Sequence, residues 1–367
     1  MGGIRGMKEK IRGGSGKMSK IIKRSLVIMM ILGVMGCGQQ VGKEKGKSLN
    51  EVLIDVGRSA ENVFYSFLEL VSGSLGFTVT KDTKKSDVGD YFSSLGKKIA
   101  SASVELEQVA VKVTADIDKD GILNKTVRSA VDSAKRTLEI LKGHLDSLKD
   151  IGDDNKVVEV VSNQQGVAAN TEKLKRAYNA LKGIVDTAGG AGVDKLKESS
   201  VTLASNVIGV NDGKNGAKVL AAGADSGSAV GEKAALIVSA VRGEEMLASI
   251  VKSAEGDAAG TISSDVTKDT SALKFAVGGS TADHLAKDVA LAGSVSGGIA
   301  MRALVKGGKL AAKDNNDEKA VQSVGISAVN KLLVAVEDII KKTVKNVIEK
   351  VKQEVDKARA PRPEVKK

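Results

Sequence analysis

Apolar residues recur at intervals of three and four over long stretches of this chain. One series runs from Val88 to Val113, a second from Leu123 to Leu148 and a third from Ile326 to Val355. This spacing puts each series on one face of an α-helix, and apolar faces of such length are buried when long helices pack at shallow angles. The pattern therefore predicts an all-α fold, an elongated helical bundle with long helices near both ends of the chain.

A shorter series predicts one more helix, over residues 48–72. Ser48 and Glu51 have the spacing of a capping box, and an apolar stripe from Val52 to Leu70 follows. This stripe needs a partner, because apolar surface left in water costs free energy, and the stripe from Leu333 to Val347 matches it. We expect these two terminal helices to pack together near the membrane, with Phe67 and Ile340 in their interface.

Glycine is concentrated in the middle of the chain, where 20 of the 41 glycines lie between Gly183 and Gly308. Helical pieces are predicted over 234–251 and 282–302, broken by loops at 189–192, 210–216 and 314–318. Gly and Ala contribute little burial and cost backbone entropy. We therefore expect residues 186–318 to form a distal, loop-rich and less stable region, and charge changes in its loops to leave stability nearly unchanged.

The charge balance does not favour nucleic acid as a partner. Of the formal net charge of +11, the first 36 residues carry +7, from eight basic residues and one acidic residue, so the remainder carries +4. Aromatic residues are 2% of the chain, and none alternates with basic residues in the way that base stacking requires. The core must therefore be built from Val, Leu, Ile and Ala, and six of the eight aromatic residues lie at 64–92, where we expect the best packing.

The first 36 residues are typical of a signal peptide. Basic residues precede an apolar run from Leu26 to Met35, which is too short for the roughly 20 residues of a spanning helix. A start at Met18 would give a more compact leader. The run Val34-Met35-Gly36-Cys37 resembles a bacterial lipobox, and this resemblance implies cleavage between Gly36 and Cys37 and lipid on Cys37. Residues 37–47 then form a lipidated tether before a single domain over 48–367. The alternative is a free cysteine in a leader that is simply removed.

Several motifs resemble functional sites without completing them. Residues 116–121 begin like a calcium loop, but the position of the closing Glu holds Val127. Residues 42–48 imitate a phosphate-binding loop with one residue too few between the glycines. His144 and His284 lack metal-ligand spacing, and no pair of carboxylates is marked as a general acid and base. We predict no catalytic residue, no metal and no cofactor, and hence no enzyme.

Three segments, residues 82–92, 298–309 and 338–342, resemble the variable large proteins of relapsing-fever Borrelia, a family of variable major lipoproteins. The resemblance implies an outer-surface lipoprotein of the cell outer membrane, expressed in one version at a time so that it escapes host antibody. It also implies that 186–318 is the variable part, and that the partners are the membrane, through lipid on Cys37, and host antibodies. The alternative function is an adhesin that binds host surface proteins on the same helical scaffold. A periplasmic structural lipoprotein is a third class.

Overall fold

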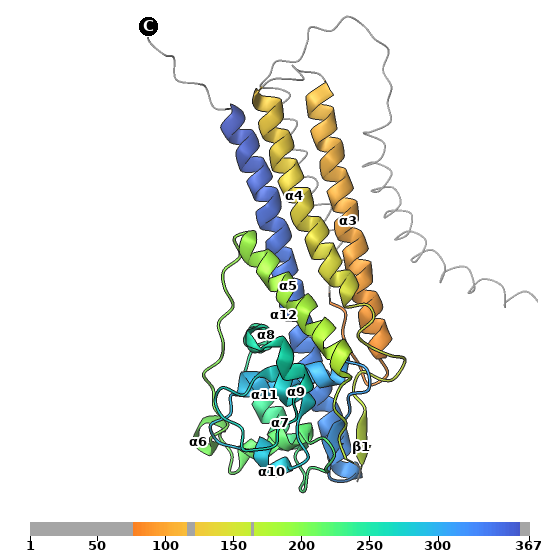
Figure 1. Ribbon diagram of the computed structural model, residues 1–367, viewed down its shortest axis with the longest axis vertical. Coiled ribbons are helices and arrows are strands. Elements are labelled where there is room, and N and C mark those ends of the chain that lie inside the picture. Colours follow the sequence, from red (N-terminus) through yellow and green to blue (C-terminus); the bar gives the residue numbers. More distant parts are fainter. Residues whose placement is uncertain (1–75, 116–121, 163–164, 360–367) are drawn as a thin grey trace, which may run out of the picture. The chain divides into compact units, whose positions relative to one another are not determined.

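Three long helices carry the apolar stripes of the sequence (Figure 1). They are α3 (Lys85–Ala115), α4 (Ile122–Ser147) and α12 (Asn315–Arg359). The stripe residues Leu95, Ile99, Leu138, Leu145 and Ile340 are completely buried, so the predicted helices and their inward faces are confirmed. The computed structural model describes residues 76–115, 122–162 and 165–359, and these all belong to one unit spanning 49–367. The predicted helix over 48–72 lies outside the described residues.

The helices α3 and α4 form an antiparallel hairpin. Lys135 of α4 pairs with Glu107 of α3 at 2.5 Å, and Gly96 of α3 lies against Asp146 at the other end of α4. Helix α12 has 45 residues, which at about 1.5 Å per residue makes it about 68 Å long. It packs against α4 and α5 and also against α7, α8 and α11. This helix therefore connects the long-helix part of the fold to the glycine-rich part.

Helix α5 (Thr171–Gly190) packs antiparallel to α4 and also contacts α12. Its N-terminus is capped by Asn170, whose side chain accepts a hydrogen bond from the Lys173 N–H at 3.0 Å. Arg176 pairs with Asp150 at 3.7 Å, and the His144 ring lies against Gly183. The helix ends at the exposed residues Gly189 and Gly190, as the glycine-rich loop predicted at 189–192 indicates.

The glycine-rich part consists of short helices and a two-stranded sheet. The strands β1 (Val160–Ser162) and β2 (Leu310–Ala312) pair in parallel, with Val160 opposite Leu310. The short helical elements are α6 (Ser205–Ile208), η1 (Gly213–Leu220), α7 (Gly231–Ser239), α8 (Gly243–Lys252), η2 (Glu255–Ala259), α9 (Ala272–Val277), α10 (Ala282–Leu285) and α11 (Ala292–Leu304).

Two of the predicted helical pieces were wrong in extent, because each is broken into two helices. The piece at 234–251 contains α7 and α8, separated by residues 240–242, and the piece at 282–302 contains α10 and α11. At the first break the chain must turn so that α8 can begin in contact with α12. A Cβ on Gly243 would lie 2.0 Å from the Lys331 carbonyl oxygen, so only glycine permits this approach.

The expectation that the middle segment contributes little burial was also wrong. All 13 residues of α11 are buried, from Ala292 to Leu304. A Cβ on Gly298 would lie 2.5 Å from the Phe275 Cβ, and one on Gly297 would lie 3.0 Å from a side-chain carbon of Ile250. Glycine at these positions allows α8 and α9 to approach α11 closely, and the resulting close packing between helices replaces the packing that a larger side chain would provide.

The loop predicted at 314–318 was wrong as well. Helix α12 begins at Asn315, and Asp317 is only 6% exposed. Asp314 starts the helix, since its carboxylate accepts hydrogen bonds from the main-chain N–H groups of Asn316 at 2.9 Å and Asp317 at 3.1 Å. Helix η1 likewise begins inside the loop predicted at 210–216, and Gly213 and Gly216 are buried there.

Candidate functional site: the loop-bearing surface

The predicted lipidation site lies outside the described residues. This holds for Gly36, Cys37, the tether at 37–47 and the calcium-like segment at 116–121. Within the part of the chain that the structure describes, no helix is both long enough and apolar enough to span a membrane. The same part contains no group of three His, Cys, Asp or Glu side chains placed to hold a metal ion.

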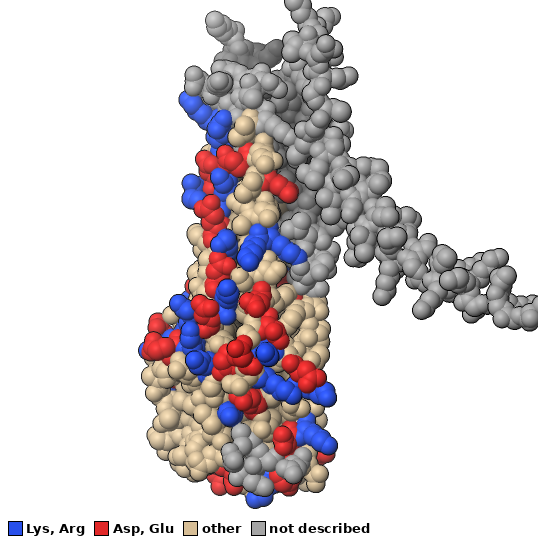
Figure 2. All heavy atoms as spheres, turned by 90° about the vertical axis from the view of Figure 1, so that its right-hand side faces the viewer, with Lys and Arg blue, Asp and Glu red and all other residues tan. Residues whose placement is uncertain are grey.

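The predicted variable part carries most of the loops, and they gather around the first half of α12. Figure 1 shows α6 and α10 at one end of the fold, opposite the end where α3 stops, α4 begins and α12 stops. The view in Figure 2 shows Lys and Arg side chains interspersed with Asp and Glu, without a large area of one sign on the described part of that face. Charged side chains on the loops form exposed ion pairs, such as Lys287 with Asp265 at 2.9 Å and Lys214 with Asp288 at 3.0 Å.

Helix α7 is held at both ends by charged side chains of α12. At its N-terminus, Asp317 accepts hydrogen bonds from the main-chain N–H groups of Val230 at 2.9 Å and Gly231 at 2.7 Å. At its C-terminus, Lys331 donates to the carbonyl oxygens of Val238 at 2.8 Å and Val241 at 2.7 Å. A negative charge at the start of a helix and a positive charge at its end both interact favourably with the helix dipole. Burial lowers the pKa of Lys331, and Glu245 opposes this change.

A second charged residue, Arg302 of α11, is completely buried. Its guanidinium donates to the carbonyl oxygens of Ala276 at 2.7 Å, Ala221 at 2.9 Å and Phe275 at 3.3 Å. Among the described residues no carboxylate lies within ion-pair distance of it, and burial lowers its pKa to about 9. Gly278, at φ 72°, leaves room for this group, because a Cβ there would lie 2.2 Å from a guanidinium nitrogen. The charge is stabilised by carbonyl dipoles at the ends of α9 and η1.

Further buried polar side chains tie the long helices to the loops. Lys85, at the start of α3, donates to the Gly308 carbonyl oxygen at 2.9 Å and lies 3.8 Å from Glu159. Burial lowers the pKa of Lys85, while Asp153 and Glu159 oppose the change. Tyr178 of α5 donates its hydroxyl proton to the Ser253 carbonyl oxygen at 2.6 Å. Tyr91 of α3 donates to the buried carboxylate of Glu337 on α12, and burial raises its pKa.

The two histidines lie in different elements, α4 and α10. His144 is half-buried at the α4–α5 contact, where burial lowers its pKa and Asp186 opposes this change. The Nε2 of His284 lies 3.9 Å from an Asp265 carboxylate oxygen, while its Nδ1 is buried and has no hydrogen-bond partner within the described ranges. Both histidine side chains are half-buried.

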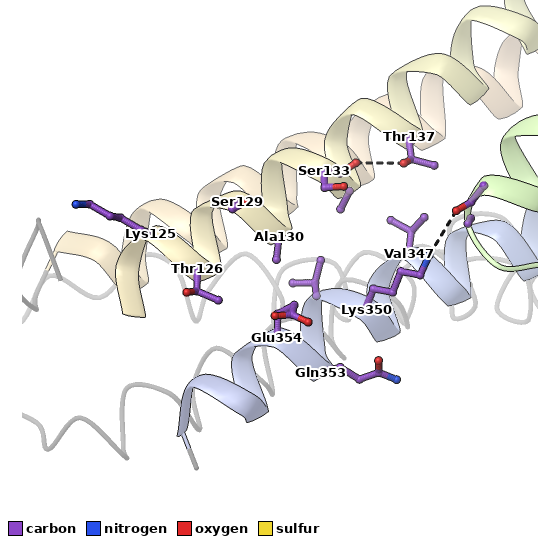
Figure 3. A pocket seen from close by; sticks show the side chains of 14 residues that line it. Lys125, Thr126, Ser129, Ala130, Ser133, Thr137, Val347, Lys350, Gln353 and Glu354 are labelled. Carbon is purple, nitrogen blue, oxygen red and sulfur yellow. Dashed lines mark hydrogen bonds between the residues drawn. The ribbon is translucent and has the colours of Figure 1, made fainter. Parts of the chain in front are cut away.

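A groove of about 760 Å³ between α4 and α12 begins where α5 ends (Figure 3). Its floor contains the buried residues Ala134, Val347 and Val351. Figure 3 shows Ser133 and Thr137 on the α4 side and Lys350 on the α12 side, where Lys350 donates to the Gly190 carbonyl oxygen at 3.5 Å. Sequence reasoning did not find this groove. The available signal was the row of small polar residues Ser129, Ser133 and Thr137 beside the apolar stripe of α4.

The sequence of residues 60–355 matches the family described as Borrelia lipoprotein. Variable large protein 25 of Borrelia hermsii is 59% identical over 94% of this chain and 98% of its own length, and variable large protein 21 of the same organism is 54% identical over 95% and 98%. Variable large protein 12 is 27% identical over 90% of this chain and 91% of its own length.

The fold is similar to the crystal structure of VlsE, a Lyme disease variable surface antigen of Borrelia burgdorferi. The TM-score is 0.66 at 25% identity, over 85% of this chain and 100% of that one. These relatives are therefore surface antigens or variable proteins of one genus, and they match nearly the full length of the chain. This chain belongs to the Borrelia lipoprotein family and, within it, to the variable large proteins.

Proposed function

We propose that this protein is an outer-surface antigen, anchored in the outer membrane by lipid on Cys37, whose loop-bearing surface changes between versions and so escapes host antibody. The observation that carries the proposal is the divergence among its relatives. Two variable large proteins that each match at least 90% of this chain differ from it at 41% and 73% of aligned positions, since their identities are 59% and 27%. Change on this scale within one fold is expected if replacement of the surface is the function.

Anchoring through Cys37 is supported by the leader and by the rest of the chain. Cys37 is the only cysteine, it follows a short apolar run, and none of the described helices is suited to span a membrane. Several acyl chains on one residue supply the multiple hydrophobic signals that stable anchoring requires. Replacement of Cys37 by Ser should abolish labelling by radioactive fatty acid and release the body from the membrane fraction. Full membrane retention of the unlabelled variant would refute this anchor.

Surface exposure is tested by protease treatment of intact cells. Trypsin should cleave the protein at exposed loop residues such as Lys268, whose side chain is 73% exposed. A periplasmic protein measured in the same cells is the control and should stay intact until the outer membrane is opened. If this protein is cleaved only after the membrane is opened, it is a periplasmic lipoprotein and the proposal is wrong.

The groove between α4 and α12 favours a second candidate function, binding of a host protein. Most of its lining residues belong to α4 and α12, outside the predicted variable part, and only Gly190 and Ala191 of the lining fall within 186–318. A protein that binds there should be bound by divergent versions alike. Saturable binding of one host protein by this chain and by variable large protein 12, lost when Ala134 is replaced by Arg, would support this function. Binding by only one version would argue against it.

A further inference from the structure

We infer that the loop-bearing segments, which lie between residues 186 and 318, are held through their main chain by four side chains, three of them buried and one half-buried. Apart from close approaches that need glycine, such as Gly278 beside Arg302, their attachment is therefore independent of the side chains that the loops carry. The four anchor residues are Tyr178 of α5, Arg302 of α11, and Asp317 and Lys331 of α12. The inference deepens the proposed function and rests on it, because it explains how the surface can be replaced while the fold is kept.

Every hydrogen bond that the side chains of the anchor residues make in the described structure goes to a main-chain atom. Arg302 and Lys331 donate to five carbonyl groups, Tyr178 donates to one, and Asp317 accepts from three N–H groups, the third being that of Lys313 at 3.0 Å. A carbonyl group is present at every residue, and an N–H group at every residue except proline. A loop with new side chains therefore still offers the same partners, provided that its backbone keeps the same path.

The side-chain contacts within the loops are of the opposite kind. Asp265, Lys268 and Asp269 form ion pairs, and their side chains are 61%, 73% and 73% exposed. Exposed ion pairs contribute little to stability, because water screens both charges and ordering the side chains costs entropy. The loops thus combine buried main-chain contacts with exposed charged contacts that contribute little, while their few buried apolar side chains, such as Ile262 and Val266, belong to the core.

The inference is tested by comparing two kinds of variant in the full chain by thermal unfolding. A loop variant changes Asp265, Lys268 and Asp269 together to Ser. There are two anchor variants, Arg302→Met and Lys331→Met. Each keeps a long side chain and removes its hydrogen-bond donors. Matched controls are Arg242→Met, whose side chain is 74% exposed, and Lys268→Met.

We expect the loop variant and both controls to unfold within about 2 °C of the natural chain and each anchor variant to lose about 6 °C or more, since several buried carbonyl groups lose their donors. If Arg302→Met does not fold, Arg302→Lys serves instead. Its single ammonium group cannot reach three carbonyls, and hydrogen exchange should become faster at 272–279. Equal losses in loop and anchor variants, or anchor variants that match their controls, would overturn the inference. Protease treatment of cells tests the proposed function separately, since its result does not depend on these melting temperatures.

Discussion

Two aspartates near the start of α12, Asp314 and Asp317, should differ sharply in their contribution to stability, although sequence alone places both in one polar loop. The carboxylate of Asp314 accepts only from main-chain N–H groups of its own helix and is exposed. The carboxylate of Asp317 is buried and accepts from Val230 and Gly231, which begin α7. Removing the first breaks a local cap, whereas removing the second leaves buried donors of another helix without partners.

The expected magnitudes follow from this difference. Loss of an exposed helix cap costs about 1 kcal/mol, because water replaces the lost acceptor. Asp317→Ala leaves two buried N–H groups unsatisfied, each at about 1 to 3 kcal/mol, so the free energy of unfolding should fall by about 4 kcal/mol. For a chain of this size 1 kcal/mol corresponds to about 2 °C, so the thermal midpoints should fall by about 2 °C for Asp314→Ala and about 8 °C for Asp317→Ala.

The assay is thermal and urea unfolding followed by circular dichroism, with both variants measured beside the natural chain. Asp317→Asn should fall between the two, because the amide oxygen still accepts a hydrogen bond but the charge that interacts with the α7 dipole is gone. A loss for Asp317→Ala that does not exceed the loss for Asp314→Ala would refute the argument that α12 holds α7 by this carboxylate.

Three further predictions concern the helices. Ile340→Asp, at a side chain that is 0% exposed, should lower the free energy of unfolding by more than about 3 kcal/mol. Val334→Asp on the same helix, at a side chain that is 54% exposed, should change it by less than about 1 kcal/mol. Urea unfolding measures both, and similar losses would contradict the placement of the α12 stripe. Gly298→Ala should lower the free energy of unfolding by about 1 to 3 kcal/mol, because the added Cβ would meet Phe275. Gly143→Ala, with no atom within 4 Å of the added carbon, should raise it by about 0.5 to 1 kcal/mol. Urea unfolding measures both, and changes of the same sign would show that the approach of Phe275 to Gly298 does not require glycine. Stability should fall as the pH drops below about 6.5, because the pKa of His144 is lowered in the fold and the unfolded chain therefore takes up the proton first. Calorimetry should show that the thermal midpoint of His144→Gln decreases less between about pH 7.5 and 5.5 than that of the natural chain. An equal decrease in both would exclude His144 as its source.

The long helices were predictable from sequence because each repeats one pattern over many turns. The stripe from Val88 to Val113 became α3 and that from Leu123 to Leu148 became α4, with bounds that differ by a few residues. Repetition of this kind averages out single exceptions, such as the exposed Val104. The family was likewise predictable, because three segments resembled it and the similarity to known relatives extends over nearly the whole chain.

The anchors of the glycine-rich part were not predictable in the same way, because their partners lie far away in sequence. Asp317 contacts Val230, 87 positions earlier, and nothing in the residues around 314–318 distinguishes it from an exposed acid. Arg302 did leave a signal, since it is the one charged residue in the otherwise apolar segment 299–305. A lone arginine between apolar residues that are buried on every side of a helix must itself be buried, and it then needs several acceptors.

The anchors contribute more to stability than the exposed surface residues do, and this difference limits where variable large proteins can diverge. A folded chain has a margin of only about 5 to 15 kcal/mol, so it can lose few buried hydrogen bonds before it unfolds. Replacing an exposed loop residue changes the free energy of unfolding by less than about 1 kcal/mol, in either direction. The effects of many such replacements therefore largely cancel. Arg302 and Asp317 each satisfy three main-chain groups, so loss of either takes a large share of the margin. Divergence should therefore concentrate at exposed loop positions and spare the anchors, even in a version as distant as one with 27% identity.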